Sequence, residues 1–325
     1  MTAFFRVFLF ALLVLPLSPG FGEAKDPIVF LPQWIPQAQF AGYYMAYEKG
    51  LYKRQGLEVT ILRGGPEHPP STLLTNGNVH FATLFLSSAI ELRSRGIPLV
   101  NIGQIVQRSG FILITRKDSR IDSPTDLEGK TVSLWSEFSL QPMAFFRKYR
   151  VKVRTVPQGT TLNLFLRGGV TAASAMWYNE YHTLLNSGLD ENELKPFFFD
   201  RHGLNFPEDG IYCLEKTLRR DPDRACRFLR ASLEGWRYAF ENPEETLDIV
   251  MKYIREANVG GNRVHQKWML ARMHDLILPM GSRTLQGHLH AEDYLRVASE
   301  LQSNGITQSI PSYGAFYGRC IAHPE

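Results

Sequence analysis

Short apolar runs alternate with longer segments whose apolar residues recur at helical spacing over the first part of the chain. The apolar runs predict strands, and the segments between them predict helices. In chain order the expected elements are a strand at 28–31, a helix at 38–55, a strand at 57–62, a helix at 71–76, a strand at 79–84, a helix at 89–95 and a strand at 99–106. Because a crossover helix lets the next strand run in the same direction, this pattern predicts an α/β lobe with a mainly parallel sheet.

The same alternation predicts a second lobe farther along the chain. Its expected strands lie at 130–135, 151–156, 172–176 and 195–199, with helices at 142–149, 162–166 and 181–187. Two extended runs, 109–115 and 205–214, are interpreted as connections that cross between the lobes. After residue 214 the pattern becomes helical, at 221–241, 243–257, 261–278 and 291–303, and these helices are assigned to the first lobe. We therefore expect a first lobe of residues 25–110 and 211–325 and a second lobe of residues 111–210.

The first 24 residues have the pattern of a secretory signal peptide. Arg6 precedes an apolar run over residues 7–17, and small residues follow before Lys25. The apolar run is too short to span a bilayer, so we expect cleavage before Lys25 and release of the mature protein. In a bacterium this address is the periplasm.

Composition narrows the function classes. A net charge of +4 without a cluster of Lys or Arg argues against a nucleic-acid partner. Cys213, Cys226 and Cys320 allow at most one disulfide, and the sequence leaves its pairing open. Their spacing is not that of a metal site, and no Ser-His-Asp order, nucleophile motif or paired-His motif is present. We expect a monomer without metal or cofactor that is not an enzyme.

The stretch Trp177, Tyr178, Asn179 and Glu180 is the main candidate site, because it lies at a predicted junction between a strand and a helix. Ligands of open α/β sheets bind beyond the carboxyl ends of the strands. A planar heterocycle would stack on an aromatic ring here while Asn179 and Glu180 hydrogen-bond its polar edge. The alternative is that Asn179 caps the helix, Glu180 complements the helix dipole and both aromatic residues belong to the core.

Further candidate ligand-binding residues are aromatic. Trp34 and Phe85 each follow a predicted strand, Trp135 ends another, and Tyr43 lies in the first predicted helix. Other polar residues receive a structural interpretation at this point: Glu208 and Asp209 as a solvated turn, and His182 as a surface or satisfied core histidine.

Several motifs resemble one known family. They are residues 34–44 (WIPQAQFAGYY), 48–52 (EKGLY), 56–59 (GLEV), 126–132 (DLEGKTV) and 177–180 (WYNE). Over residues 27–214 the chain is similar to the periplasmic substrate-binding proteins related to thiamine-pyrimidine synthase. The resemblance implies an α/β, two-lobed type II periplasmic binding protein fold with a cleft between the lobes. A protein of this family is expected to deliver a small molecule to the membrane permease of an ABC importer. The WYNE motif resembles the branch that binds pyrimidines and flavins, so the expected ligand is a formylaminopyrimidine precursor of thiamine or riboflavin.

Two alternatives follow from the same resemblance. The synthase branch carries a cysteine-rich iron motif and a histidine near the first helix, whereas this chain has no cysteine before Cys213 and no histidine in residues 34–57. A pyrimidine-synthase-like enzyme is therefore the second alternative. The first is a binding protein for a small anion such as an alkanesulfonate, taurine or nitrate, which would require cations in the cleft in place of the aromatic side chains of Trp34, Trp135, Trp177 and Tyr178.

Overall fold

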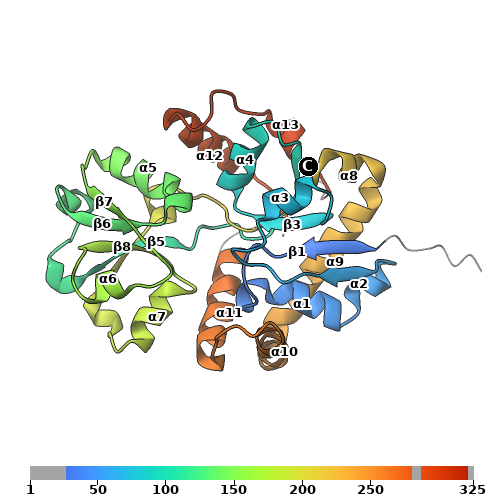
Figure 1. Ribbon diagram of the computed structural model, residues 1–325, viewed down its shortest axis with the longest axis horizontal. Helices are drawn as coiled ribbons and strands as arrows, with labels where there is room; N and C mark the ends of the chain where they lie inside the picture. Colours follow the sequence, from blue (N-terminus) through green and yellow to red (C-terminus); the bar gives the residue numbers. More distant parts are fainter. Residues whose placement is uncertain (1–26, 280–286, 321–325) are drawn as a thin grey trace, which may run out of the picture.

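The computed structural model describes residues 27–279 and 287–320. The predicted signal peptide, residues 1–24, lies outside these ranges. Within them the chain forms two five-stranded sheets, each covered by helices, and Figure 1 shows the resulting two lobes side by side. We call the lobe that contains β1 the first lobe and the lobe that contains β5 the second.

The first sheet has the order β2-β1-β3-β10-β4. Its strands are β1 (Ile28–Leu31), β2 (Val59–Ile61), β3 (Phe81–Leu84), β4 (Leu99–Gln104) and β10 (Gly210–Leu214). β1 is parallel to β2 and β3, as predicted, but β10 is antiparallel to both of its neighbours. The helices along the early part of this lobe are α1 (Ala41–Glu48), α2 (Leu51–Arg54), α3 (Pro70–Thr75) and α4 (Leu86–Ser94).

The second sheet has the order β7-β6-β8-β5-β9. Its strands are β5 (Phe111–Arg116), β6 (Thr131–Leu134), β7 (Arg154–Pro157), β8 (Ala172–Met176) and β9 (Leu194–Phe198). β6 is parallel to β7 and β8, whereas β5 is antiparallel to β8 and β9. Its helices are α5 (Leu140–Tyr149), α6 (Asn163–Leu166) and α7 (Glu180–Asn186).

The two extended runs predicted as crossings are mainly strands, so the prediction is wrong for residues 111–115 and 210–214, whereas residues 109–110 and 205–209 do lie in the connections. Residues 111–116 form β5 inside the second sheet, and residues 210–214 form β10 inside the first. Both runs are apolar along almost their whole length, which suits a strand buried on both faces. The connections between the lobes are the shorter segments 105–110 and 199–209, and the second of them includes a 3-10 turn at Phe199–His202.

The helix predicted over residues 38–55 is broken into a 3-10 turn, Ala38–Phe40, followed by α1 and α2. Gly50 takes a left-handed conformation between the two helices, with φ of 66°. Gly42 on α1 is required for packing, because a Cβ atom there would lie 2.2 Å from Cγ of Trp236. Gly235 is equally constrained, since its Cβ would lie 2.1 Å from the carbonyl oxygen of Gly42. The absence of both side chains lets α1 cross α9 in direct contact.

The helices after β10 do more than complete the first lobe. They are α8 (Glu215–Arg220), α9 (Pro222–Glu241), α10 (Pro243–Glu256), α11 (Arg263–Ile277), α12 (Ala291–Ser303) and α13 (Tyr313–Phe316). α9 packs on α1, α2 and β4 of the first lobe. α11 also contacts α7, and α12 also contacts α5, so both helices reach the second lobe.

A disulfide joins Cys226 on α9 to Cys320 near the end of the described chain. The sequence had left this pairing open. Cys213, on β10, is buried and free. Burial raises the pKa of the Cys213 thiol to about 12, so this thiol is unreactive at neutral pH. The bond holds the segment after α13 against α9. Disulfides are typical of proteins in oxidising compartments.

Reduction of the Cys226–Cys320 bond should lower the melting temperature. The bond closes a loop of 94 residues, and constraining such a loop in the unfolded chain contributes about 2–4 kcal/mol. The measurement is thermal unfolding with and without a phosphine reductant, for the wild type and the Cys226→Ser, Cys320→Ser double variant. The Cys213→Ala variant is the control and should keep the sensitivity to reductant. Equal melting temperatures for oxidised and reduced wild type would contradict a stabilising bond.

Candidate functional site

A buried carboxylate is one of the groups that join the two connections between the lobes, together with Asn205 and the Arg108–Asp200 ion pair. Glu208, on the second connection, is 2% exposed. Its Oε1 atom accepts hydrogen bonds from the backbone N–H of Gly110 at 2.6 Å and of Phe111 at 3.1 Å, and from the hydroxyl of Ser109 at 3.2 Å. Its Oε2 atom is buried with no hydrogen-bond partner among the described residues. The side chain thus binds the first connection directly.

Asp209, the next residue, ties the same place to the start of the first lobe. It is also 2% exposed. Its Oδ2 accepts from the amide of Gln39 at 2.6 Å, and its Oδ1 accepts from the amide of Gln33 in the loop after β1. The interpretation of Glu208 and Asp209 as a solvated turn is therefore wrong. The two acids directly precede β10, whose residues are all buried. Their position beside a buried strand is the sequence feature that could have indicated their burial.

Burial changes the titration of this acid pair. Burial and the neighbouring Asp209 raise the pKa of Glu208 to about 8. Burial raises the pKa of Asp209 to about 7, against the hydrogen bonds from Gln39 and Gln33. Near neutral pH the pair therefore holds a proton that two exposed carboxylates would have lost.

Tyr178 lies beside the acid pair. It is 2% exposed, and a Cβ atom on Gly110 would lie 3.0 Å from its ring. Burial, with the nearby Glu208 and Asp209, raises the pKa of its hydroxyl well above the ordinary value. The candidate stretch after β8 and the two connections therefore meet at one buried point.

Asn179 and Glu180 interact with each other at the start of α7. The amide of Asn179 donates to Oε1 of Glu180 at 2.8 Å, and the backbone N–H of Met176 donates to Oε2 at 2.9 Å. Asn179 occupies the N-cap position, but its side chain makes no capping hydrogen bond, so the capping alternative does not describe it. Burial raises the pKa of Glu180 to about 7.

Helix α11 supplies the other side of this site. Nε2 of His265 lies 2.8 Å from Oδ1 of Asn179, and the indole N–H of Trp268 donates to the carbonyl of Trp177 at 3.0 Å. The guanidinium of Arg272 lies 4.7 Å from the ring centroids of both Trp177 and Trp268, which is a cation–π arrangement. Sequence reasoning missed these three α11 residues. Their spacing, three and then four residues apart, placed them on one helix face, but it also fits an ordinary packed helix.

The remaining predicted site residues fall into three environments. Phe85 from the first lobe packs on Phe138 of the second lobe, with ring centroids 5.0 Å apart. Trp135 contacts the same Phe138 at 6.5 Å, so the structure brings Phe85 and Trp135 into one cluster. Trp34 is 36% exposed on the turn after β1, whereas Tyr43 is 0% exposed.

Tyr43 and Trp177 both have their rings in contact with protein. Tyr43 packs against Phe30 at 4.7 Å and Trp236 at 5.9 Å, inside the core of the first lobe. Trp177 has Phe198 edge-on at 5.3 Å in addition to Arg272. Trp177 therefore contacts side chains of both lobes, and a ligand could stack on the ring face that Arg272 covers only after that side chain moved.

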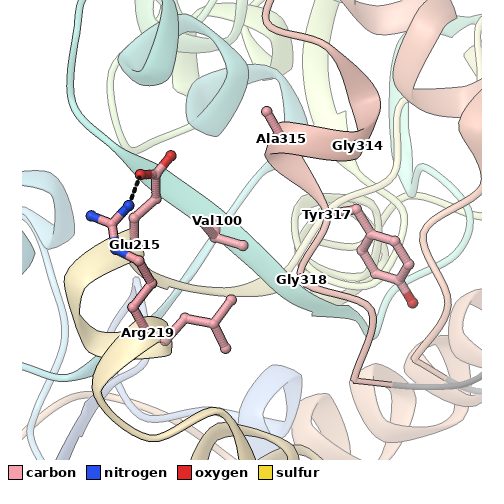
Figure 2. A pocket seen from close by; sticks show the side chains of 8 residues that line it. Val100, Glu215, Arg219, Gly314, Ala315, Tyr317 and Gly318 are labelled. Carbon is pink, nitrogen blue, oxygen red and sulfur yellow. Dashed lines mark hydrogen bonds and ion pairs between the residues drawn. The ribbon is translucent and has the colours of Figure 1, made fainter.

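Two surface pockets lie away from this region. Figure 2 shows one between β4, α8 and the segment around α13, where Glu215 forms an ion pair with Arg219. The other adjoins β5 and α6 in the second lobe. Neither is lined by a predicted site residue. In the ranges 27–279 and 287–320, no group of three or more metal-ligating side chains occurs, and no helix is long and apolar enough to cross a membrane.

Comparison with known proteins agrees with this architecture. Residues 37–246 match the family model described as "NMT1/THI5 like". The chain belongs to the NMT1/THI5-like family. This assignment confirms the resemblance drawn from the sequence motifs.

Relatives in the family are named as binding proteins and as enzymes. The chain is 26% identical over 303 residues to the riboflavin-binding protein RibY of Chloroflexus aurantiacus, covering 88% of this chain and 85% of the relative. It is 26% identical over 244 residues to the formylaminopyrimidine-binding protein of Halalkalibacterium halodurans, covering 73% of each. It is also 21% identical over 264 residues to a 4-amino-5-hydroxymethyl-2-methylpyrimidine phosphate synthase of Schizosaccharomyces pombe, covering 75% of this chain and 73% of the synthase.

Solved structures show the fold. The periplasmic aliphatic sulphonate binding protein SsuA of Escherichia coli matches with a TM-score of 0.69 at 14% identity, covering 88% of this chain and 95% of that chain. The predicted two-lobed periplasmic binding protein fold is therefore confirmed. The desulfurization enzyme DSZB also matches, with a TM-score of 0.58 at 12% identity, covering 88% of this chain and 94% of that chain, so the fold alone does not distinguish binding from catalysis.

The buried acids predict that stability falls as pH rises from 6.5 to 8.5. The folded-state pKa of Glu208 is about 8, above its ordinary value of 4.5, so in this window the folded chain holds more protons than the unfolded chain. Asp209 and Glu180, both with a pKa of about 7, act in the same direction. Since one pKa unit corresponds to about 1.4 kcal/mol, the unfolding free energy should drop by at least about 1 kcal/mol across this window.

Glu208→Gln tests the assignment, because a carboxamide resembles the protonated acid and does not titrate. Urea unfolding at pH 6.5 and 8.5 should show a flatter pH dependence for this variant than for the wild type. Glu191→Gln, at an exposed position of the second lobe, is the control and should keep the wild-type slope. Identical slopes for Glu208→Gln and wild type would show that Glu208 does not carry the effect.

Proposed function

We propose that the protein is the solute-binding component of an ABC importer and that it binds a planar nitrogen heterocycle, riboflavin or a formylaminopyrimidine, between its lobes. The observation that carries the proposal is the half-buried, hydrogen-bonded Asn179–Glu180 pair beside Trp177 and Tyr178. A carboxamide and a carboxylate together offer N–H donors and oxygen acceptors to the edge of a ring, while aromatic surface favours its faces. The names of the two bacterial relatives support this ligand class.

The lobes of this proposal are residues 25–110 with 211–325, and residues 111–210. They close on the ligand by a hinge motion about the connections 105–110 and 199–209. Phe85 and Trp135 meet at Phe138 from opposite lobes, and together with Trp34 on the turn after β1 they are the further aromatic contacts. Tyr43 supports the ligand site indirectly, because its ring packs in the core of the first lobe. The monomer then presents the closed form to a permease in the inner membrane.

We also infer that the protein works in the periplasm and releases its ligand unchanged. The Cys226–Cys320 disulfide and the apolar run at residues 7–17 support export. The lack of a cysteine before Cys213 and of a histidine in residues 34–57 supports binding without synthesis. Mass spectrometry of the ligand before and after incubation with the protein tests this point, and a pyrimidine product formed with stoichiometric iron would overturn it.

Glu180→Gln should weaken binding of the heterocycle. A hydrogen bond to a charged acceptor contributes about 1.5–3 kcal/mol, so we expect roughly a ten- to hundredfold loss in affinity. The measurement is calorimetric titration with riboflavin and with formylaminopyrimidine at pH 8.5, where the Glu180 carboxyl, with a pKa of about 7, is ionised. Glu191→Gln is the matched control.

Thermal melts of the ligand-free proteins separate the two roles open to Glu180. Equal dissociation constants with a lowered melting temperature would show that its carboxylate only supports the turn at Met176. Taurine and an alkanesulfonate are titrated alongside. Tight binding of either anion, without binding of a heterocycle, would overturn the proposed ligand class in favour of a small anion.

A further inference from the structure

A chain of hydrogen-bonded side chains connects α7 and α11 and ends on Glu180. Nδ1 of His182 lies 3.0 Å from Nδ1 of His265, whose Nε2 lies 2.8 Å from Oδ1 of Asn179. Asn179 in turn donates to Glu180 at 2.8 Å. His182 and Asn179 belong to the second lobe and His265 to the helical layer of the first, so the chain crosses between the lobes.

The donors in this chain can be assigned from its end. The Glu180 carboxylate accepts, so the Asn179 amide presents its NH₂ group to Glu180 and its oxygen to His265. Nε2 of His265 must then carry a proton to donate to that oxygen. A neutral His265 with its proton on Nε2 has an accepting Nδ1, which receives the Nδ1–H of His182. In this arrangement every donor points toward Glu180.

One further contact fits this order only when an amide is turned over. Nδ2 of Asn186 lies 3.2 Å from Nδ1 of His182, a placement in which the amide would donate to that nitrogen. With Nδ1 of His182 as the donor, Asn186 turns its carbonyl oxygen to that nitrogen, an exchange of amide orientation that leaves the rest of the chain unchanged.

We propose that His265 is a positioning residue of the ligand site, which reaches from α11 to hold the Asn179 amide in a single orientation for the ligand. The proposal rests on the function proposed above. A carboxamide that rotates by half a turn exchanges its donor for its acceptor, so its orientation decides which ring edge it recognises. The Glu180 carboxylate holds the NH₂ group of Asn179 on one side. The Nε2 atom of His265, 2.8 Å from Oδ1, holds the amide oxygen on the other side, so the two contacts favour the same orientation.

The surroundings of His265 favour its neutral form. Burial, with a contribution from His182, lowers the pKa of His265 to about 4, and burial lowers the pKa of His182. On α11 the flanking cations are paired with α10: Arg263 with Glu244 and Asp248, and Lys267 with Glu244.

Among the other groups that face His182 and His265, one acid is linked to the hydrogen-bonded chain. The ring of Trp268 stacks on His182 with centroids 5.0 Å apart, and Arg272 is paired with Asp275 at 2.9 Å. Glu180, beyond Asn179, is therefore the acid linked to the chain, and it favours the donor order given above.

Three variants test the proposal by calorimetric titration at pH 7.5 with riboflavin and with formylaminopyrimidine. His265→Ala removes the donor and should weaken binding about 5- to 20-fold, the size expected for one part-buried hydrogen bond. His265→Gln keeps an N–H at a position that can reach Asn179, so it should stay within about threefold of wild type. His274→Ala is the control, because His274 lies on the same helix at 50% side-chain exposure, and its affinity should be unchanged.

A second readout uses the ligand-free protein, so the result does not depend on which ligand is correct. The side-chain amide of Asn179 is identified in a ¹⁵N spectrum by its loss in Asn179→Asp. Wild type, His265→Gln and His274→Ala should give one Asn179 amide pair at similar shifts with slow hydrogen exchange. In His265→Ala the pair should shift and exchange faster.

These outcomes separate the two proposals. If wild type binds neither heterocycle, the proposed function fails, and the spectrum of the ligand-free protein still decides the role of His265. An unchanged Asn179 signal in His265→Ala overturns the positioning role. A lowered melting temperature of His265→Ala with an unchanged dissociation constant also overturns it, as does failure of His265→Gln to restore binding.

Discussion

A buried carboxylate helps to fasten the connections between the two lobes, beside the hydrogen bonds of Asn205 and the Arg108–Asp200 ion pair. Glu208 on the second connection binds the backbone of Gly110 and Phe111 on the first, so the two segments about which the lobes would rotate are fastened to each other. A buried carboxylate is costly to desolvate, and here two backbone donors and one hydroxyl offset part of that cost. The remaining cost appears as the raised pKa of Glu208. A side chain of this kind restricts the lobes to motions that keep the two connections together.

The contacts around Glu208 and the two connections form two groups, one toward the first lobe and one toward α7 and α11. On one side Asp209 binds the glutamines that follow β1, which ties the second connection to the first lobe. On the other, Tyr178 leads to Asn179 and Glu180 at the start of α7 and from there to α11. A ligand between the lobes would thus meet residues already linked to the hinge, so binding and the relative position of the lobes are physically coupled.

Sequence periodicity was sufficient for most of the fold because short buried strands and long amphipathic helices have distinct patterns. It failed at residues 111–116 and 210–214, since an extended apolar run looks the same whether it crosses between lobes or pairs inside a sheet. In the site, the motif at 177–180 was visible because four unusual residues are adjacent. His265 and Glu208 were not, because their partners lie 86 and 98 residues away in the chain and no local pattern encodes such a contact.

The position of β10 has a consequence for how the chain is made. This strand lies between β3 and β4, yet it is synthesised only after the whole second lobe. Until residue 214 leaves the ribosome, β3 and β4 have no strand between them and the first sheet cannot close. Contacts between residues so far apart also form slowly. The first lobe therefore cannot complete its fold until the second lobe has been synthesised.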